Sequence, residues 1–569
     1  MFVHCMTRGN TPMITSEPID VPDLSAYDIL KDTAGKYPNN IAYEYFGYKV
    51  NYHKFLKQVD DLSLRLRKMG VYQGDRAIVC LPNCPQSLVA FYALSRLGAI
   101  AVMVHPLSSK NEIEYYIRDS QSKLAITLGL FAENFPKIGS FEGFQTLIVT
   151  SPVDMLPYIS ARVAELVNKD ARMPKGHLGF GIIRWEKMMK DDISHVPTDM
   201  PHVSADEPVS ILYTGGTTGI NKGAVHSSRS FNSTAWGMIE LSGVLGEGTT
   251  MLAEMPMFHG FGLCTCVHMP VCIGLKIVLM PTFTLDSLCK TIVKKKVNFI
   301  AGVPTMYEKM IGNKYLVNAN LSFLKGIYCG GDSMSIESKA RVDKFLMEHG
   351  SERRVKIGFG CTECLAATAI TPKFDERPGS IGVPIPGFSY QITKIGTTEE
   401  APDGEDGEIC IYGPSLMDCY YGRPEETAEV LVKHDDGKVW LHTGDVGYID
   451  DGFIFFKNRI KRMIVTSGYN VYPSQIEELL SRHPAVDISC VVGVPDDKRG
   501  SRVKAFVVLK DGVPKDDATL NSIKSFVKEN IAAYAKPREY VFVDSLPRTK
   551  LKKIDYRKLE QGILTEDEE

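Results

Sequence analysis

Apolar and polar positions follow a repeated helix-then-strand pattern from Ala26 to about residue 150, and the pattern returns at 286–305 and 321–349. In "KFLKQVDDLSLRLRKMG", apolar side chains recur every three or four positions, which predicts an amphipathic helix that ends at Gly70. The run "RAIVCLP" that follows is typical of a buried strand. The same order returns in "QSLVAFYALSRLGAIAVMVHP" and from residue 286 to about 305. This alternation predicts a helix-covered parallel sheet, the α/β class.

The pattern changes in the last third of the chain. Short β-rich runs such as "GSIGVPIPGFSYQITK" and "GEICIYGP", separated by Gly, Pro and Asp, predict a compact β-subdomain at about residues 379–456. After Lys461 the order strand, helix, strand, strand, helix predicts a small α+β domain. We therefore expect an N-terminal domain at 1–460 and a C-terminal domain at 461–569, with the first twenty residues as a loose polar lead-in.

Composition narrows the functional classes. The chain has 569 residues, 65 basic and 68 acidic side chains, and a formal net charge of −3, which gives no indication of nucleic-acid binding. It shows no signal peptide and no apolar stretch of membrane-spanning length, so we expect a cytoplasmic protein without an integral membrane segment. The 13 cysteines are scattered, which favours reduced thiols. The C-x-C pair Cys264 and Cys266 and the C-x-x-C pair Cys361 and Cys364 lack further ligands at zinc spacing, so we interpret them as structural.

The segment "ILYTGGTTGINKGAVHSS", residues 211–228, is the strongest chemical signal. Glycines after a strand can turn tightly and expose backbone N–H groups, threonine hydroxyls add donors, and Lys222 adds a positive charge. A surface turn is the alternative, but the density of these residues favours a phosphate-binding loop. The pattern is not that of the P-loop, because Gly223 follows Lys222 where a hydroxyl is required, and no G-x-G-x-x-G occurs here.

Further motifs occur in a fixed order along the chain. They are "MPMFHGFG" (255–262), "GGDSMS" (330–335), "GFGCTE" (358–363), "GEICIYGP" (407–414), "LHTGDVGYID" (441–450), "KNRIKRMIVTSGYNVYPSQIE" (457–477) and "LPRTKLKKID" (546–555). With "YTGGTTGINKG", this series resembles the adenylate-forming superfamily, which includes acyl-CoA synthetases, aryl-CoA ligases, firefly luciferase and the adenylation domains of peptide synthetases. The resemblance covers nearly the whole chain from about residue 26. It implies a ligase that joins a carboxylate to the α-phosphate of ATP, releases pyrophosphate and passes the acyl group to coenzyme A.

The resemblance also implies an ATP site and a Mg²⁺ site. Thr214 to Lys222 would hold the β- and γ-phosphates, Thr362 and Glu363 would lie at the α-phosphate, and Glu363 would bind Mg²⁺. Phe359 stands where many relatives have tyrosine, which preserves stacking on adenine but not a hydroxyl contact. Asp445 and Arg459 would bind the ribose. The implied ATP- and AMP-binding residues are Thr214, Gly215, Gly216, Thr217, Thr218, Gly219, Lys222, Gly330, Gly331, Asp332, Phe359, Gly360, Thr362, Asp445, Arg459 and Lys553.

The implied catalytic residues are Lys553, Glu363, Thr362 and His259. By resemblance, Lys553 bridges the ribose and the attacked carboxylate, where it stabilises growing negative charge. Lys552 replaces the usual family glycine, so which of the two lysines enters the site stays open. By resemblance, His259 lies beside the substrate carboxylate, and the acyl pocket contains His259, Gly260, Phe261 and Gly358.

The resemblance implies a rotating C-terminal domain. Lys461 takes the position of the family hinge residue. Rotation about it would replace Lys553 in the active site, where it serves adenylation, with "TSGYN", which serves thioester formation. Within "TSGYN", Gly468 would line the coenzyme A tunnel. A turn between two strands is the alternative for Gly468. Val465 occupies a position that is lysine in aryl-CoA ligases and luciferases, so luciferase-like oxygenation has no support.

The sequence leaves the identity of the carboxylic acid substrate open. "FHGFGLCTCVHMP" has no acidic residue to pair with an α-ammonium group, which disfavours an amino acid. The small apolar stretches favour a medium- or long-chain fatty acid, with an aryl acid such as a cinnamate second. Only sixteen residues follow Lys553, which favours free coenzyme A over an appended carrier, although a separate carrier protein stays an alternative. A noncatalytic nucleotide-binding protein is the alternative of another class. We expect a monomer or a homodimer.

Overall fold

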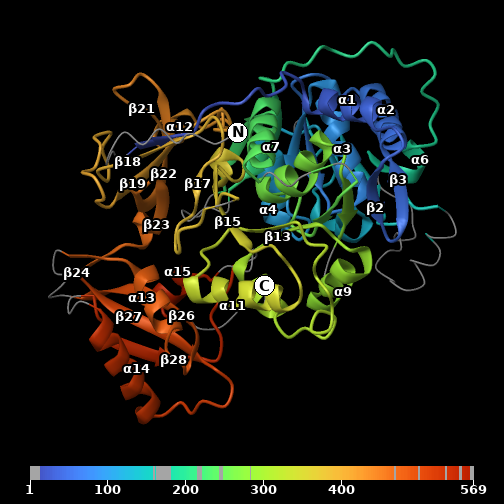
Figure 1. Cartoon of the computed structure of the whole chain (residues 1–569). Helices are drawn as coiled ribbons and strands as arrows, with labels where there is room; N and C mark the ends of the chain where they lie inside the picture. Colours follow the sequence, from blue (N-terminus) through green and yellow to red (C-terminus); the bar gives the residue numbers. More distant parts are fainter. Residues whose placement is uncertain are drawn as a thin grey trace.

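The computed structural model describes residues 13–141, 143–157, 161, 181–214, 221–242, 246, 248–281, 284–373, 375–466, 469–496, 500–531, 535–549 and 554–563. Within these ranges the chain forms two mainly parallel sheets with helices, an antiparallel sheet and a smaller C-terminal α+β unit (Figure 1). The predicted α/β class, with a smaller C-terminal domain, is confirmed. None of the helices in these ranges has both the length and the apolarity needed to cross a bilayer.

The first sheet has the order β20-β10-β9-β5-β4-β6-β7-β8. Neighbouring strands from β9 to β8 run parallel, whereas β10 and β20 are antiparallel additions at one edge. The strands are β4 (Arg76–Cys80), β5 (Ile100–Met103), β6 (Leu124–Leu128), β7 (Thr146–Thr150), β8 (Ile182–Arg184), β9 (Pro208–Tyr213), β10 (Gly223–Ser227) and β20 (Cys419–Tyr420).

The predicted helix that ends at Gly70 is present as α2, which begins at Tyr52, two residues before the predicted segment. It ends at Lys68, and Gly70 follows with φ +83°, which favours glycine. The helices are α1 (Ala26–Lys36), α2 (Tyr52–Lys68), α3 (Pro85–Leu97), α4 (Lys110–Ser120), α6 (Trp185–Met188) and α7 (Ser228–Ser242), with the 3-10 turn η1 (Gly129–Asn134). Helices α1, α2 and α3 pack against one another in a core that takes in residues of both parallel sheets.

The second sheet has the order β17-β16-β15-β14-β13-β11-β12-β2-β3. Its strands are β2 (Ile41–Tyr45), β3 (Tyr48–Asn51), β11 (Thr250–Ala253), β12 (Lys276–Leu279), β13 (Phe299–Gly302), β14 (Gly326–Cys329), β15 (Val355–Phe359), β16 (Ala369–Ile370) and β17 (Val383–Pro384). Its helical segments are the π-helix η3 (Phe261–His268), α8 (Met269–Cys272), α9 (Leu285–Lys295), α10 (Pro304–Met310), α11 (Ile336–Glu348) and the 3-10 turn η4 (Thr362–Cys364).

The antiparallel sheet has the order β1-β18-β19-β22-β21, with β23 paired to β22. Its members are β1 (Met13–Thr15), β18 (Ser389–Thr393), β19 (Gly407–Tyr412), β21 (Leu431–Lys433), β22 (Val439–Asp450) and β23 (Phe453–Arg459), and α12 (Pro424–Ala428) lies beside it. The expectation of a loose lead-in over the first twenty residues is wrong for Met13–Thr15, because this strand pairs with β18 and buries Ile14.

The C-terminal unit contains a sheet of order β25-β24-β27-β26, with β28 paired to β27. Its elements are η5 (Ile460–Arg462), β24 (Ile464–Thr466), β25 (Tyr469–Val471), α13 (Pro473–Ser481), β26 (Val486–Asp496), β27 (Gly500–Leu509), α14 (Asp517–Asn530), β28 (Glu539–Phe542) and α15 (Tyr556–Glu560). The predicted order strand, helix, strand, strand, helix corresponds to β24, α13, β26, β27 and α14, whereas β25, β28 and α15 were not predicted. This red and orange part lies below the antiparallel sheet in Figure 1, and Arg482 of α13 forms an ion pair with Glu337 of α11 at 2.9 Å.

Candidate active site

The phosphate-loop segment connects two antiparallel strands at the edge of the first sheet. Tyr213 at the end of β9 is paired with Gly223 at the start of β10. The Thr214 N–H donates to the Lys222 carbonyl oxygen at 2.9 Å, which closes the base of the loop. Gly215, Gly216, Thr217, Thr218 and Gly219 lie outside the described residues, so their predicted role is a proposal.

The predicted α-phosphate residues lie in a short turn after β15. Thr362 and Glu363 form η4, and this turn is held from two other parts of the chain. His226 of β10 donates from Nε2 to the Thr362 carbonyl oxygen at 2.8 Å, and the Met417 N–H donates to the Glu363 carbonyl oxygen at 2.7 Å. The first and second sheets therefore meet at Thr362 and Glu363.

The Glu363 carboxylate is oriented by a tyrosine that no motif included. The Tyr420 hydroxyl donates to Glu363 Oε1 at 2.6 Å, and burial together with this carboxylate raises the pKa of Tyr420. Lys222 Nζ lies 4.9 Å from the centre of the Tyr420 ring. Because β20 pairs with β10, Tyr420 lies beside the base of the phosphate loop and contacts both Lys222 and Glu363. Carboxylate and hydroxyl oxygens suit Mg²⁺, so Glu363 and Thr362 fit the metal that the family implies.

His226 is a second residue that the sequence analysis missed. It is fully buried, and burial lowers its pKa to about 4, so its ring is neutral at pH 7. A neutral ring donates from one nitrogen only, and the bond to Thr362 makes Nε2 that donor. No sequence pattern assigns a role to His226 or Tyr420, because each contacts the Thr362–Glu363 turn, which is distant from it in sequence.

Glycines allow the turn and the neighbouring strands to pack closely. A Cβ atom on Gly360 would lie 1.6 Å from the Ala366 carbonyl oxygen, and one on Gly260 would lie 1.6 Å from the Leu365 carbonyl oxygen. The segment around Gly260 and the turn after Gly360 are therefore in backbone contact. His259 precedes Gly260, which brings it to the Thr362–Glu363 side of the molecule.

A second group of glycines lies at the ends of neighbouring strands β14 and β15. A Cβ atom on Gly330 would lie 3.1 Å from the Gly358 carbonyl oxygen and 3.8 Å from the Phe261 ring. Gly331 has φ +79°, which favours glycine, and the exposed Asp332 follows it. The structure thus brings Gly330, Gly358 and Phe261 together.

The predicted ribose residues form an ion pair across β22 and β23. Asp445 and Arg459 are cross-strand partners, and Arg459 Nε lies 3.2 Å from Asp445 Oδ1. The Asp445 carboxylate raises the pKa of Arg459. Asp445 is buried, whereas half of the Arg459 side chain is exposed. Phe359 lies near β23, with its ring centre 6.1 Å from that of Phe456.

Several residues predicted for the two half-reactions lie outside the described ranges. Lys552, Lys553 and Gly468 belong to this group. Lys461 is described, and it is an exposed residue of η5, the short turn between β23 and β24.

The cysteine pairs agree with their structural interpretation. Every cysteine in the described ranges is a free thiol. Cys361 Sγ lies 3.4 Å from Cys364 Sγ within the Thr362–Glu363 turn, and Cys264 and Cys266 are buried in the π-helix.

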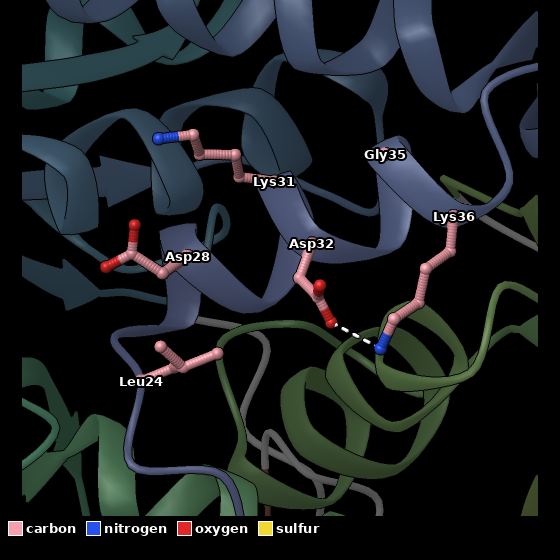
Figure 2. A pocket seen from close by; sticks show the side chains of 6 residues that line it. All are labelled: Leu24, Asp28, Lys31, Asp32, Gly35 and Lys36. Atoms are coloured by element: carbon pink, nitrogen blue, oxygen red, sulfur yellow. Dashed lines mark ion pairs between the residues drawn. The ribbon is translucent and has the colours of Figure 1, made fainter.

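A surface depression along α1 contains none of the motif residues. Figure 2 shows it with the Asp32–Lys36 ion pair of 2.7 Å. Its lining residues are Leu24, Asp28, Lys31, Asp32, Gly35 and Lys36. We do not assign it to the active site.

Comparisons with known proteins agree with this geometry. The model of the AMP-binding enzyme family matches residues 30–421, and that of the AMP-binding enzyme C-terminal domain matches residues 475–553. The chain belongs to the AMP-binding enzyme family. This membership and the relatives below confirm the predicted class, an AMP-forming acyl-CoA ligase that uses ATP and coenzyme A.

Two curated relatives and one solved structure align with most of the length of this chain. A long-chain-fatty-acid–CoA ligase of Bacillus subtilis (strain 168) is 33% identical over 97% of this chain and 98% of its own. The 4-coumarate–CoA ligase 2 of Oryza sativa subsp. japonica is 29% identical over 87% of this chain and 84% of its own. An anthranilate CoA ligase in complex with anthranoyl-AMP superposes with a TM-score of 0.79 at 23% identity, covering 96% and 98% of the two chains, and this likeness shows the fold alone.

Proposed function

We propose that this AMP-forming acyl-CoA ligase activates a long-chain fatty acid. The acid would attack the α-phosphate of ATP to give an acyl-adenylate and pyrophosphate, and coenzyme A would then take the acyl group. The 33% identity to a relative that carries this activity in its name supports the fatty acid. An aryl acid is the second candidate, supported by the 29% identity to a coumarate ligase.

The observation that carries the adenylation site is the meeting of Lys222, Tyr420 and Glu363. Both reactants are anions, so the site must offer positive charge and hydrogen-bond donors where negative charge builds up. Lys222 and Glu363 contact one tyrosine, Lys222 at its ring and Glu363 at its hydroxyl, although they are far apart in sequence. In our assignment Lys222 contacts the terminal phosphates and Thr362 the α-phosphate.

We assign Mg²⁺ to Glu363, with the Thr362 hydroxyl beside it. When bound, the ion would neutralise phosphate charge. Tyr420 donates to one carboxylate oxygen of Glu363 and so fixes the direction in which the carboxylate faces. Asp445 would accept hydrogen bonds from the ribose hydroxyls, with Arg459 holding its carboxylate in place.

The acyl group would lie along the π-helix Phe261–His268. Its side chains are buried except for Phe261, and the sequence "FGLCTC" contains no charged residue. An apolar tail can therefore be accommodated without leaving a charge unpaired. We assign His259 and Gly260 to the carboxylate end and Gly358 to the opposite wall.

We further propose that Lys553 serves the first half-reaction and Gly468 the second. Rotation about the exposed Lys461 would exchange them, which places the domain boundary between 460 and 461. A cytoplasmic location, and a monomer or homodimer as the working form, stay predictions.

Pyrophosphate exchange tests this function. We would measure carboxylate-dependent ATP–pyrophosphate exchange with fatty, aryl and amino acids, then add coenzyme A and identify the product by mass. We expect exchange and a thioester with long-chain fatty acids. A thioester formed only from aryl acids would favour the second candidate, and exchange without a thioester would point to a carrier protein as acceptor. Absence of exchange with every acid would contradict the proposal.

A further inference from the structure

Two histidines and a cysteine lie together in the antiparallel sheet. Cys410 falls in the motif "GEICIYGP" and His442 in "LHTGDVGYID", but the resemblance assigns no role to either residue. Cys410 of β19 is the cross-strand partner of both Gln391 of β18 and His442 of β22, so the three form one row across the sheet. His434 directly follows β21. A ring nitrogen of each histidine and the Cys410 sulfur all lie within 4.8 Å of one another, and Cys410 and His434 are buried.

The hydrogen bonds of His442 fix where its proton lies. Its Nδ1 is 2.9 Å from Glu408 Oε2, and Glu408 Oε1 accepts the Gly444 N–H at 2.9 Å. An ionised carboxylate only accepts hydrogen bonds, so the Nδ1 atom of His442 carries a proton. In a neutral ring, Nε2 then carries no proton and can only accept a hydrogen bond or bind a metal through its lone pair.

The hydrogen bonds of His434 lead to the same tautomer. The Gln391 amide nitrogen donates to Glu400 Oε1 at 2.9 Å, which fixes the orientation of the amide. The Gln391 oxygen therefore faces His434 Nδ1, at 2.9 Å, and accepts its proton. Nε2 of His434 again carries no proton and has a free lone pair.

These two lone pairs face each other. The Nε2 atoms of His434 and His442 are 2.9 Å apart, a distance that requires a cation on at least one of them. A proton shared between the two rings could supply the charge, and so could a metal ion, which would also engage the adjacent Cys410 sulfur. A metal ion satisfies both nitrogens at once.

We propose that Cys410, His434 and His442 bind a Zn²⁺ ion. Tetrahedral zinc with bonds of about 2.0–2.1 Å to nitrogen holds two imidazole nitrogens roughly 3.3 Å apart, so the two rings, with Nε2 atoms 2.9 Å apart here, would move slightly apart to hold the ion. Imidazole and thiolate ligands select zinc over the oxygen-preferring Mg²⁺ that serves ATP. Three protein ligands leave a fourth position for water. Binding replaces the thiol proton of Cys410, which passes to solvent as the sulfur–zinc bond forms.

The surroundings match those of metal-binding histidines. Such histidines donate their second ring N–H to a carboxylate or carbonyl oxygen, as His442 does to Glu408 and His434 to Gln391. Glu408 also holds the Gly444 N–H, directly before Asp445. The ion would therefore tie together the strands that carry the proposed ribose carboxylate.

Metal analysis of the full-length protein tests the site. We would prepare metal-free protein, add Zn²⁺ or Co²⁺ in the presence of excess Mg²⁺, and measure bound metal after gel filtration. We expect one equivalent of Zn²⁺ per chain. Co²⁺ should give thiolate charge-transfer absorption and quench Trp440, whose ring stacks on His434 with centres 5.5 Å apart.

Matched variants separate the site from adventitious binding. Cys410→Ser should lose the charge-transfer band and most of the bound metal, whereas Cys490→Ser, a buried cysteine of β26, should keep both. Trp440→Phe should lose the quenching component but keep the zinc. Wild-type protein that binds no zinc overturns the proposal whether or not the variants fold, and equal metal in the Cys410→Ser and Cys490→Ser proteins overturns it too.

Discussion

Tyr420 and His226 show how single residues orient the adenylation turn. Each donates one hydrogen bond to the Thr362–Glu363 segment, Tyr420 to a side chain and His226 to the backbone. Neither is placed to touch a reacting atom in our assignment. Both are positioning residues, and their effects should appear in the groups that they hold.

Replacing Tyr420 with phenylalanine should weaken Mg²⁺-dependent adenylation. The change removes a hydrogen bond to a charged group, worth about 1.5–3 kcal/mol, so we expect pyrophosphate exchange to fall about tenfold or more and the Mg²⁺ requirement to rise. Exchange rates measured across a Mg²⁺ series would show this. Tyr421→Phe, in the neighbouring residue, is the control. Equal loss in both variants would count against the role of Tyr420.

His226 should make the protein less stable in mild acid. Its pKa is about 4 when folded against about 6.5 when unfolded, so the unfolded chain binds more protons between these values. The free energy of unfolding therefore falls as the pH falls through this window, by up to about 3 kcal/mol from this group. Buried His268, with a pKa of about 3, acts in the same direction.

Urea unfolding from pH 7 to pH 4 would measure this effect. His226→Gln keeps a side-chain donor but does not titrate, so its stability should depend less steeply on pH than that of the wild type. The remaining slope should include the contribution of His268. Identical slopes in the two proteins would mean that His226 is not held neutral in the folded state.

At the scale of elements, the turn after β15 depends on backbone contact. Gly360 lets the chain fold back onto Ala366, and Gly260 lets the segment before the π-helix reach Leu365. Side chains at either position would separate the segment before the π-helix from the turn that carries Thr362 and Glu363. Stability and activity should therefore be sensitive to the same glycines.

Gly360→Ala should lower both stability and activity. Its Cβ atom would meet a backbone oxygen, which cannot move as a side chain can, so we expect a loss of about 1–3 kcal/mol and a lower exchange rate. Thermal unfolding and pyrophosphate exchange are the measurements. Gly35→Ala in α1, where a Cβ would meet nothing within 4 Å, should be neutral or slightly stabilising. A Gly360→Ala protein as stable and active as the wild type would show that the turn can relax.

At the scale of the whole molecule, we propose that two half-reactions use two faces of the C-terminal unit. The short turn η5, with Lys461 exposed, joins this unit to β23 of the antiparallel sheet. Arg482 and Glu337 add an ion pair between the C-terminal unit and α11, and its partly exposed side chains make it easy to break. The Ser474 hydroxyl also donates to the Lys457 carbonyl oxygen of β23, so a rotation would have to break this hydrogen bond as well as the ion pair.

Separate assays of the half-reactions test this division. Lys553→Ala should lower acyl-adenylate formation by about 100-fold or more, since it removes charge stabilisation at the reacting centre, yet leave thioester formation from supplied acyl-adenylate largely intact. Gly468→Leu should do the reverse by blocking the thiol. Lys552→Ala is the control for the neighbouring lysine. Parallel loss of both half-reactions in either variant would contradict the role assigned to that residue.

The sequence by itself determined the family, the order of elements and the motif residues. Helical and strand periods are local, so α2, β4 and, after Lys461, β24, α13, β26, β27 and α14 could be predicted directly, whereas β25, β28 and α15 were not predicted. Motif order identified Glu363 and Asp445 as candidates.

The tertiary structure alone decided which residues meet. Strand pairing set β20 beside β10, which brought Tyr420 to Glu363 and Lys222, and it carried β1 from the N-terminus to β18. The row Gln391–Cys410–His442 likewise depends on the register of three strands. Side chains on adjacent strands become neighbours through hydrogen-bond register rather than sequence spacing, and no local period encodes that register.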